Sequence, residues 1–301
     1  MKSLSKLFNK ININGTMLFD EPLSGHSTFK TGGNADLLAV PQNISALEEL
    51  LSVIKENDIP YFILGGGANI LFSDSGFRGV VIDMAGFNSI SFNDCIVKSG
   101  AGAEFSLAAE EACKKSLSGL EYFYGMTGST GGSEYMYARC YGKSVSDVLY
   151  KVKYLDELGK ICTYRAKQGD FGYKKSPFQN TKNIILEAEF ILQHSGRDIL
   201  LDKSAEFKKD REAKGHYSFP CAGSVFKNNR EFGHPSGKII DSLGLRGFSI
   251  GGALVSPLHA NIIVNNGNAT SEDIKKLIHF IEEKVFKTYG FRLEREIIYI
   301  D

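Results

Sequence analysis

Two glycine-rich stretches contain residue types that could hold a charged ligand through the backbone. The first is Gly65-Gly66-Gly67-Ala68-Asn69-Ile70, which follows strand-type residues at 61–64. Glycine has no Cβ, so its backbone reaches positive φ and can approach a ligand closely. Successive N–H groups in such a turn can converge on an anion, so this loop could hold a pyrophosphate. A plain tight turn between a strand and a helix is the alternative interpretation.

The spacing of the first loop matches neither the dinucleotide fingerprint nor the nucleoside-triphosphate loop, because no Lys-Ser/Thr pair follows it. The second stretch has five glycines between residues 125 and 142. That density disfavours the interior of a helix or a strand. Its apolar residues, among them Met126, Tyr135 and Tyr141, disfavour a solvated surface loop. We therefore expect a buried, glycine-lined channel for an extended cofactor.

Composition excludes several classes of protein. Of 301 residues, 43% are hydrophobic and 23% are charged, which is ordinary for a globular chain. Lys+Arg and Asp+Glu both number 35, so no basic excess points to nucleic acid. The five cysteines include no Cys-x-x-Cys pair, which disfavours a disulfide scaffold and a zinc site, and a reducing compartment is the default. No apolar run predicts a signal peptide or a membrane span.

Periodicity predicts the elements that must position these loops. Apolar residues at helical spacing predict helices over 44–54 and 103–115, and a third that begins at a Thr270–Asp273 cap. Residues 202–215 are charged and helix-prone. Residues 1–26 are expected to be peripheral. Strand-type runs occupy 61–64, 80–82, 95–97, 150–164, 184–188 and 292–298. This order of strands and helices predicts an α/β or α+β architecture.

The separation of Gly65-Gly66-Gly67-Ala68-Asn69-Ile70-Leu71 from Gly128-Ser129-Thr130-Gly131-Gly132 resembles that of the two flavin-binding loops in the vanillyl-alcohol-oxidase-type (PCMH-type) FAD domain. From about residue 27 to 300 the chain resembles the UDP-N-acetylenolpyruvoylglucosamine reductase family, in its shorter form. That resemblance implies an α+β fold. It places a two-lobed FAD-binding domain at 1–203, with lobes of about 1–85 and 86–203, and a substrate-binding domain at 204–301.

The resemblance also implies a reaction. NADPH would reduce non-covalently bound FAD, and a hydride would then pass to the enolpyruvyl ether of UDP-N-acetylglucosamine enolpyruvate. The product would be UDP-N-acetylmuramate for peptidoglycan synthesis in the bacterial cytoplasm. A monomer is expected, with neither nucleic acid, membrane nor metal as a partner.

By the same resemblance, Ser224 would donate a proton and Glu296 would assist at the reacting group. The simple alternatives are a turn serine and an exposed strand residue, with Glu294 as the competing carboxylate. Lys174 stands where the family has an arginine that clamps the substrate carboxylate. Substrate binding would involve Tyr173, Lys214, Lys227 and Asn228. The flavin would be held by Gly65, Gly66, Gly67, Ala68, Asn69, Ile70, Gly128, Ser129, Gly131 and Gly132.

The second loop departs from the family pattern. Thr127 replaces the usual proline, Glu134 replaces a small apolar residue, and Tyr137 and Arg139 replace the usual asparagine and glycine, or one of them. An ionised Glu134 that points toward the flavin would disfavour its reduced, anionic form.

Two other functions are compatible with these loops. The first is an oxidoreductase of the same superfamily that acts on a sugar or alcohol, often with covalently attached flavin. No histidine lies near residues 65–71, which leaves Cys140 as the candidate attachment point. The second is a non-catalytic UDP-sugar or flavin binder. The presence of Ser224, Lys227, Asn228 and Glu296 together argues against it.

Overall fold

The computed structural model describes residues 2–167 and 169–301 of the chain. The chain divides into two compact units. Unit 1 comprises Met1–Phe19, Asp36–Gly66 and Gly79–Lys209, and unit 2 comprises Asp20–Ala35, Gly67–Arg78 and Asp210–Asp301. Each unit has a hydrophobic core of its own. The chain therefore passes several times between the two units, and the first glycine loop is one of these passages.

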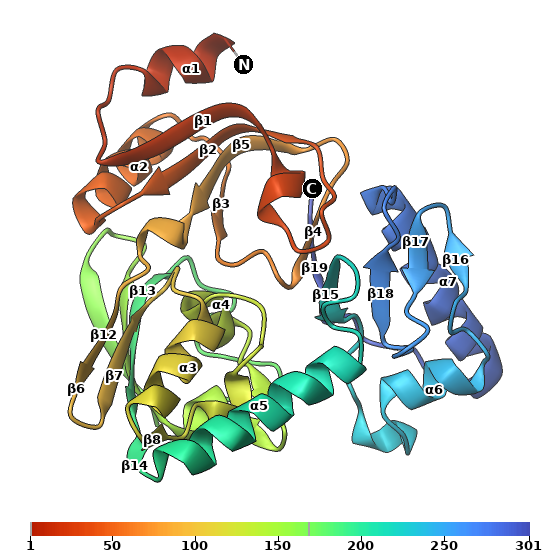
Figure 1. Cartoon of the computed structure of the whole chain (residues 1–301). Helices are drawn as coiled ribbons and strands as arrows, with labels where there is room; N and C mark the ends of the chain where they lie inside the picture. The colour runs from red at the N-terminus through yellow and green to blue at the C-terminus, as the bar shows by residue number, and fades with distance from the viewer. Residues whose placement is uncertain (1, 168) are drawn as a thin grey trace. The chain divides into compact units, whose positions relative to one another are not determined.

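Helices and strands alternate along the chain, as Figure 1 shows. The α-helices are α1 Lys2–Phe8, α2 Ile44–Glu56, α3 Phe105–Lys114, α4 Thr130–Tyr135, α5 Arg197–Ala213, α6 Ser236–Ser242 and α7 Ser271–Tyr289. The strands are β1 Gly15–Pro22, β2 Asn34–Pro41, β3 Tyr61–Leu64, β4 Ile70–Phe72, β5 Phe77–Asp83, β6 Ile90–Asn93, β7 Ile96–Gly100, β8 Leu117–Ser118, β9 Arg139–Cys140, β10 Lys143–Ser144, β11 Leu149–Leu155, β12 Ile161–Arg165, β13 Ile184–Ile191, β14 Gln193–His194, β15 Cys221–Ser224, β16 Ser249–Ile250, β17 Ala253–Val255, β18 Ile262–Asn265 and β19 Ile298–Ile300. This mixture confirms the predicted α+β class.

Strand β3 leads into the first glycine loop, and its position is determined by its neighbour β5 in the sheet β1-β2-β5-β3. Strand β3 pairs in parallel with β5, with Tyr61 opposite Val80. A parallel pair needs a crossover connection, so the chain does not turn back directly after Leu64. Helix α2 precedes β3 and begins as predicted, because the Asn43 side chain accepts a hydrogen bond from the N–H of Ala46 at 2.9 Å.

A second sheet of unit 1, with strand order β12-β11-β13-β7-β6, supports the second glycine loop. Its neighbouring strands are antiparallel, and β11 and β12 form a hairpin within the strand-type run 150–164. Helix α3 lies against this sheet (Figure 1). Its first residue, Phe105, is fully buried between the rings of Phe123 and Phe190, at centroid distances of 5.0 and 5.6 Å.

The prediction that the second glycine stretch contains no helix is wrong. Residues 130–135 form the short helix α4, which includes Gly131 and Gly132. Glycine is unfavourable in a helix because it loses much backbone entropy, but close packing can override that preference. Here a Cβ on Gly131 would lie 2.9 Å from the Cβ of Ala101, so only glycine lets α4 approach that residue.

The prediction that residues 1–26 are peripheral is wrong. Phe8 and Leu23 are fully buried, and Ile13 is 8% exposed. Phe8 and Ile13 belong to the core of unit 1, where they pack in the same cluster as Leu47 on α2. A polar average over residues 1–26 hid these apolar anchors.

In unit 2, the antiparallel sheet β15-β18-β17-β16 carries helix α7 (Figure 1). The helix buries Ile274, Leu277, Ile278, Ile281 and Val285. Thr270 and Asp273 form the predicted capping box, in which each side chain accepts from the other residue's backbone N–H. The apolar spacing and the cap together specified this helix correctly from the sequence.

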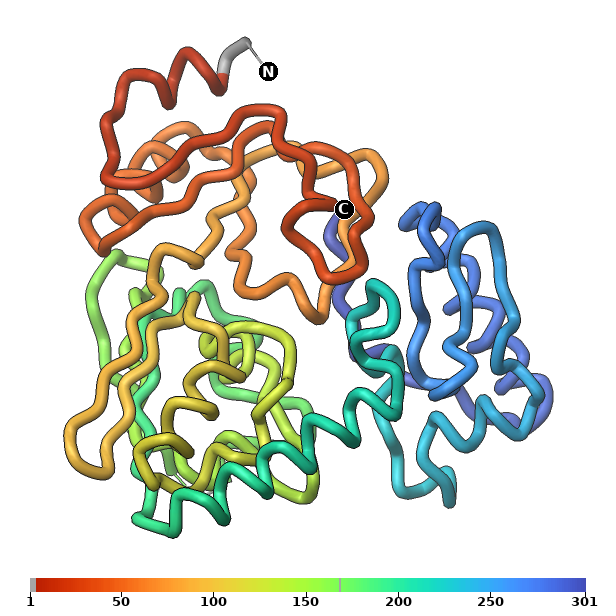
Figure 2. Tube along the Cα trace, viewed as in Figure 1, coloured from red at the N-terminus to blue at the C-terminus, as the bar shows by residue number. Residues whose placement is uncertain are grey.

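The last residues of the chain differ from the predicted strand over 292–298. The strand β19 covers only Ile298–Ile300 and pairs in parallel with β4, with Ile298 opposite Ile70. Figure 2 shows this blue C-terminal end running beside the orange segment that follows the first glycine loop. Residues 292–297 contact another partner, through a bridge between Arg295 and Phe226. Because the segment changes partner at residue 298, it does not form one continuous strand.

The division into domains at residue 203 stays a prediction. That position lies inside helix α5, whereas the compact units divide at Lys209. Among the described residues, no helix is both long enough and apolar enough to cross a membrane.

Candidate active site

The two glycine loops interlock in unit 1. The Ser129 hydroxyl accepts hydrogen bonds from the backbone N–H groups of Gly66, at 3.2 Å, and Gly132, at 3.3 Å. A Cβ on Gly66 would lie 2.7 Å from the Cα of Gly128, and one on Gly65 would lie 2.6 Å from the Ser129 hydroxyl. Glycine is therefore required in the first loop because the backbone of the second loop occupies the space of a side chain.

The next residues of the first loop belong to unit 2 and form a turn suited to an anion. Gly67 has φ +63°, and a Cβ there would lie 2.2 Å from the carbonyl oxygen of His26. Among the described residues, none accepts a hydrogen bond from the backbone N–H of Gly67, Ala68 or Asn69. Consecutive N–H donors around a left-handed residue form an anion-binding concavity. These residues fit the pyrophosphate of the predicted FAD.

Backbone hydrogen bonds anchor the second loop on the connection between β7 and α3. Thr130 N–H donates to the carbonyl of Ala103 at 2.9 Å, and Gly131 N–H donates to the carbonyl of Ala101 at 2.8 Å. The Thr130 hydroxyl also lies 2.6 Å from that of Ser99. Residues 128–132 are therefore positioned by the β7–α3 connection, and Ser129 starts helix α4 as its N-cap. Such backbone rigidity suits a ligand that is recognised by main-chain groups.

Glu134 is the exceptional side chain of this loop. It is fully buried in α4, and neither of its carboxyl oxygens has a hydrogen-bond partner among the described residues. Burial raises its pKa well above the usual value of 4.5, because a buried carboxylate lacks the solvation that its charge requires. Burial thus favours the protonated, uncharged form of Glu134 in the loop.

We expect the buried Glu134 to make the protein less stable as pH rises. Above pH 4.5 its carboxyl ionises in the unfolded chain but stays protonated in the folded one, so unfolding releases a proton. The contribution of Glu134 to the free energy of unfolding therefore falls by up to about 1.4 kcal/mol per pH unit, until the pH reaches the pKa of the folded state. Glu134→Gln keeps the shape and cannot ionise, so its advantage over the wild type in urea unfolding should grow from pH 5 to pH 8.

The matched control for Glu134→Gln is Glu49→Gln, because Glu49 is exposed on α2. The control should unfold with the pH dependence of the wild type. Equal pH dependence in Glu134→Gln and the wild type would show that Glu134 is ionised in the folded protein.

The segments that carry three predicted site residues are joined in unit 2. Ser224 ends β15 and is half-buried. The residue after it, Val225, accepts a hydrogen bond from the backbone N–H of Glu296 at 2.8 Å. The carbonyl of Glu296 in turn accepts from the Asn69 side-chain amide at 3.0 Å. The structure thus links the segment of Ser224, the backbone of Glu296 and the first glycine loop through two hydrogen bonds.

Lys227 and Asn228 both have protein partners. The Lys227 ammonium lies 2.5 Å from the Glu294 carboxylate. The backbone N–H of Lys227 also donates to the backbone carbonyl of Glu294, at 2.8 Å. The side-chain oxygen of Asn228 accepts from the N–H of Ser236 at 2.9 Å, next to the start of α6. Glu294 therefore orients Lys227, and neither Glu294 nor Glu296 lies within a strand.

Lys214 lies in a strongly positive part of unit 2. Its ammonium pairs with Asp210 at 2.6 Å, one turn earlier in the chain. Burial, together with the charge of Arg211 and the nearby His259 and Lys214, lowers the pKa of His216 to about 4. Burial lowers the pKa of His259 as well, and Lys214 and Arg246 contribute. Both imidazoles are therefore neutral at neutral pH, mainly because burial disfavours their charged form.

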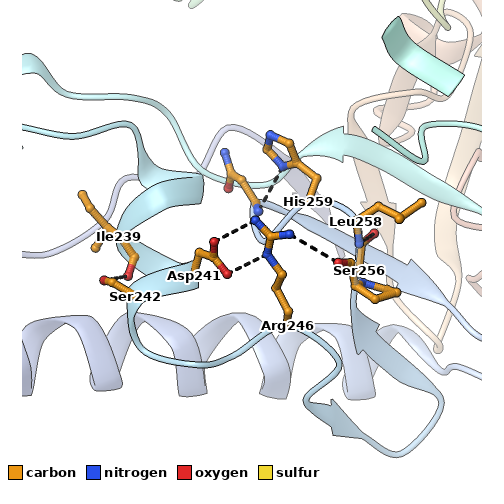
Figure 3. A network of polar contacts seen from close by, with 9 residues as sticks. Ile239, Asp241, Ser242, Arg246, Ser256, Leu258 and His259 are labelled. Atoms are coloured by element: carbon orange, nitrogen blue, oxygen red, sulfur yellow. Dashed lines mark hydrogen bonds and ion pairs between the residues drawn. The ribbon is translucent and has the colours of Figure 1, made fainter. Parts of the chain in front are cut away.

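Figure 3 shows how His259 is positioned. Its Nδ1 accepts a hydrogen bond from the backbone N–H of Asn261 at 3.2 Å. Beside it, Arg246 holds the carboxylate of Asp241 through two nitrogens, with contacts of 2.6 and 2.7 Å. This two-point contact fixes the arginine side chain between α6 and the loop that carries His259.

Tyr173 and Lys174 lie at the tip of a tight turn in unit 1. Gly172 and Lys175 close the turn by exchanging two backbone hydrogen bonds of 2.9 and 3.0 Å. Lys174 has φ +56°, an uncommon conformation for a residue with a side chain. Tyr173 is 45% exposed at the same tip. The guanidinium of Arg139 lies 5.7 Å from the centre of the Tyr173 ring.

Sequence reasoning assigned no role to Asn261, which positions the Ser224 segment. Asn261 is 3% exposed, and its side chain exchanges two hydrogen bonds with the backbone of Phe226, at 3.0 and 2.8 Å. Its own carbonyl accepts from the N–H of Val225 at 2.8 Å. The available signal was a polar residue next to the apolar run 262–264 of a buried strand.

Comparisons with known proteins place these loops in a family. Residues 35–165 match the model of the FAD binding domain, and residues 215–300 match that of the UDP-N-acetylenolpyruvoylglucosamine reductase C-terminal domain. The UDP-N-acetylenolpyruvoylglucosamine reductase of Borrelia garinii subsp. bavariensis is 40% identical over 301 residues, which covers 100% of this chain and 97% of the relative. The protein of that name from Treponema denticola is 42% identical over 302 residues, covering 95% and 94%.

The fold is similar to that of a solved relative. The crystal structure of UDP-N-acetylenolpyruvylglucosamine reductase from Thermus caldophilus superposes with a TM-score of 0.80 and 27% sequence identity. The match covers 96% of this chain and 100% of the other. The similarity therefore extends over both compact units.

Proposed function

Because this chain belongs to the UDP-N-acetylenolpyruvoylglucosamine reductase family, we propose that Ser224, Glu296 and Lys174 carry out the reduction of an enolpyruvyl ether on a UDP-sugar. The protein is an FAD-dependent oxidoreductase of peptidoglycan synthesis. The finer assignment gives NADPH as the reductant and UDP-N-acetylglucosamine enolpyruvate as the substrate. UDP-N-acetylmuramate is the product.

One observation supports this assignment above the others. The backbone of Glu296 is bonded both to Val225, directly after Ser224, and to Asn69 of the first glycine loop. A proton donor must lie near the place where the cofactor acts, because proton transfer needs hydrogen-bond reach.

The residues of the two loops fit FAD. Gly67, Ala68 and Asn69 offer backbone donors to its pyrophosphate, and Gly66 packs closely on Gly128 of the second loop. When bound, FAD supplies the hydride that NADPH has given it. Burial raises the pKa of Glu134 and so disfavours a carboxylate charge in this loop, which makes the departure at this position compatible with flavin reduction.

Non-covalent binding agrees with the position of Cys140. Its thiol donates to the backbone carbonyl of Tyr122 at 3.1 Å. A thiol engaged in that way is directed at the protein backbone, which does not favour attachment of a flavin ring.

The chain's own chemistry takes place at the carbon that bears the substrate carboxylate. Negative charge develops there after hydride addition and spreads onto the carboxylate, and Ser224 donates the proton that quenches it. A serine hydroxyl is a weak acid, so nearby cations must lower the cost of its alkoxide. Lys227, three residues further along, is oriented by Glu294 for this role.

Charge complementarity supports the substrate contacts. Lys174 and Tyr173 would meet the carboxylate side of the substrate. Lys214, together with Arg211 and Arg246, would attract the anionic groups of the UDP moiety through its positive charge. Asn228 would orient the sugar. A cytoplasmic monomer completes the proposal.

The reaction can be tested optically. Under anaerobic conditions, NADPH should bleach the bound flavin, and adding UDP-N-acetylglucosamine enolpyruvate should restore its colour within a single turnover. UDP-N-acetylglucosamine, which lacks the enolpyruvyl group, is the control and should restore none. A flavin that NADPH reduces but the enolpyruvyl substrate fails to reoxidise would refute the assignment.

A further inference from the structure

Arg139 is an arginine without a carboxylate partner among the described residues. It is exposed on the short strand β9. Its guanidinium lies 5.7 Å from the ring centres of both Tyr137 and Tyr173. In the described part of the chain it makes no ion pair with a carboxylate. A guanidinium set between two aromatic rings keeps its hydrogen-bonding fork available for a ligand.

The backbone that carries Arg139 is anchored on both sides. On one side, Tyr137 is buried, its hydroxyl lies 3.0 Å from that of Ser146, and its ring packs on Phe171 at 5.0 Å. On the other side, the Tyr141 ring stacks on Phe207 at 4.3 Å. Arg139 therefore extends from a fixed hairpin, which lowers the entropy that a ligand contact costs.

Arg139 lies near Tyr173, which is in the turn that carries Lys174. Tyr173 precedes Lys174, the residue assigned to the substrate carboxylate, and both form the tip of one tight turn. Lysine offers a point charge, whereas a carboxylate is held best by the planar fork of arginine. The turn thus carries Lys174 itself, and the guanidinium of Arg139 on β9 lies beside the turn.

We propose that Arg139 is a substrate-binding residue that shares the carboxylate of the enolpyruvyl group with Lys174. The inference rests on the proposed function, since that function supplies a substrate with a carboxylate. Arg139 contributes the fork and Lys174 the second positive charge. The pair confers specificity for a UDP-sugar with a carboxylate over one without it.

The first test compares two ligands on the FAD-loaded enzyme by calorimetry. UDP-N-acetylmuramate carries the carboxylate, and UDP-N-acetylglucosamine lacks it. Arg139→Ala should weaken binding of the first about tenfold or more, in the range of a charge-assisted hydrogen bond, and leave the second unchanged. Arg165→Ala is the matched control, because Arg165 also lies over a tyrosine ring, that of Tyr150, but on strand β12. It should change neither affinity.

The second test is a rescue. In the Arg139→Ala background, Lys174→Arg returns a guanidinium to the same turn and should restore most of the lost affinity for UDP-N-acetylmuramate. Loss without rescue would overturn the shared carboxylate site. Equal weakening of both ligands in Arg139→Ala would show a merely structural role, and unchanged binding would overturn the proposal outright.

These outcomes are distinct from a failure of the proposed function. If the wild-type enzyme binds neither ligand and does not reoxidise its flavin with the enolpyruvyl substrate, the function itself is wrong. If the wild type does both and Arg139→Ala matches it, only the role of Arg139 is wrong.

Discussion

Ser224→Ala is expected to slow product formation by about 10²- to 10⁴-fold, the usual contribution of a positioned general acid. The reduction of bound flavin by NADPH should stay at the wild-type rate, because Ser224 acts only after hydride transfer. The rate of UDP-N-acetylmuramate formation in a single turnover, followed by rapid quench, measures the effect. The first half-reaction, followed by flavin absorbance, serves as the internal reference.

The matched control for Ser224→Ala is Ser249→Ala, because Ser249 is an exposed serine of the same unit. The control should form product at the wild-type rate. Ser224→Cys keeps an ionisable group at the position and should recover part of the activity. Product formed at an undiminished rate by Ser224→Ala would mean that another group, such as Glu296, supplies the proton.

Gly66→Ala is expected to weaken FAD binding by about 10- to 100-fold, or about 1.4 to 2.7 kcal/mol. The added Cβ would lie 2.7 Å from the Cα of Gly128 and 2.8 Å from the N of Ser129. Both atoms are backbone, so the two loops must separate and the hydrogen bond from Gly66 N–H to Ser129 is lost. Quenching of flavin fluorescence during reconstitution of the apoprotein measures the affinity.

Gly25→Ala is the control for a glycine substitution without a clash. A Cβ on Gly25 would meet nothing within 4 Å, and its φ is not in the left-handed region. We expect wild-type FAD affinity for this variant. If Gly66→Ala binds FAD as the wild type does, the contact between the two loops is not needed to form the cofactor site.

Local sequence signals were sufficient for the elements that are stabilised within a few residues. Helices α2 and α7 follow from apolar spacing and from side-chain caps that bond three residues along the chain. The glycine loops were visible because glycine marks close approach of backbones. The resemblance to the family also rests on these short motifs, and full-length relatives confirm it.

The same reasoning failed where a contact partner far along the chain decides the outcome. Helix α4 was missed because propensity argues against glycine, whereas Gly131 is needed for packing on Ala101. The strand predicted over 292–298 was shortened, because its first part bonds with the segment after Ser224 and its last part with β4. Local periodicity contains no information about such a change of partner.

Residue types and short spacings thus specified the caps, the helices and the glycine loops, because each depends on interactions within one or two turns of chain. Long-range pairing needed the folded protein. Asn69 and Glu296 are 227 residues apart in the chain, yet one hydrogen bond joins them. The burial that raises the pKa of Glu134 and the placement of Arg139 beside Tyr173 arise in the same way. Each depends on which segments pack together, and that choice is made by the whole core at once.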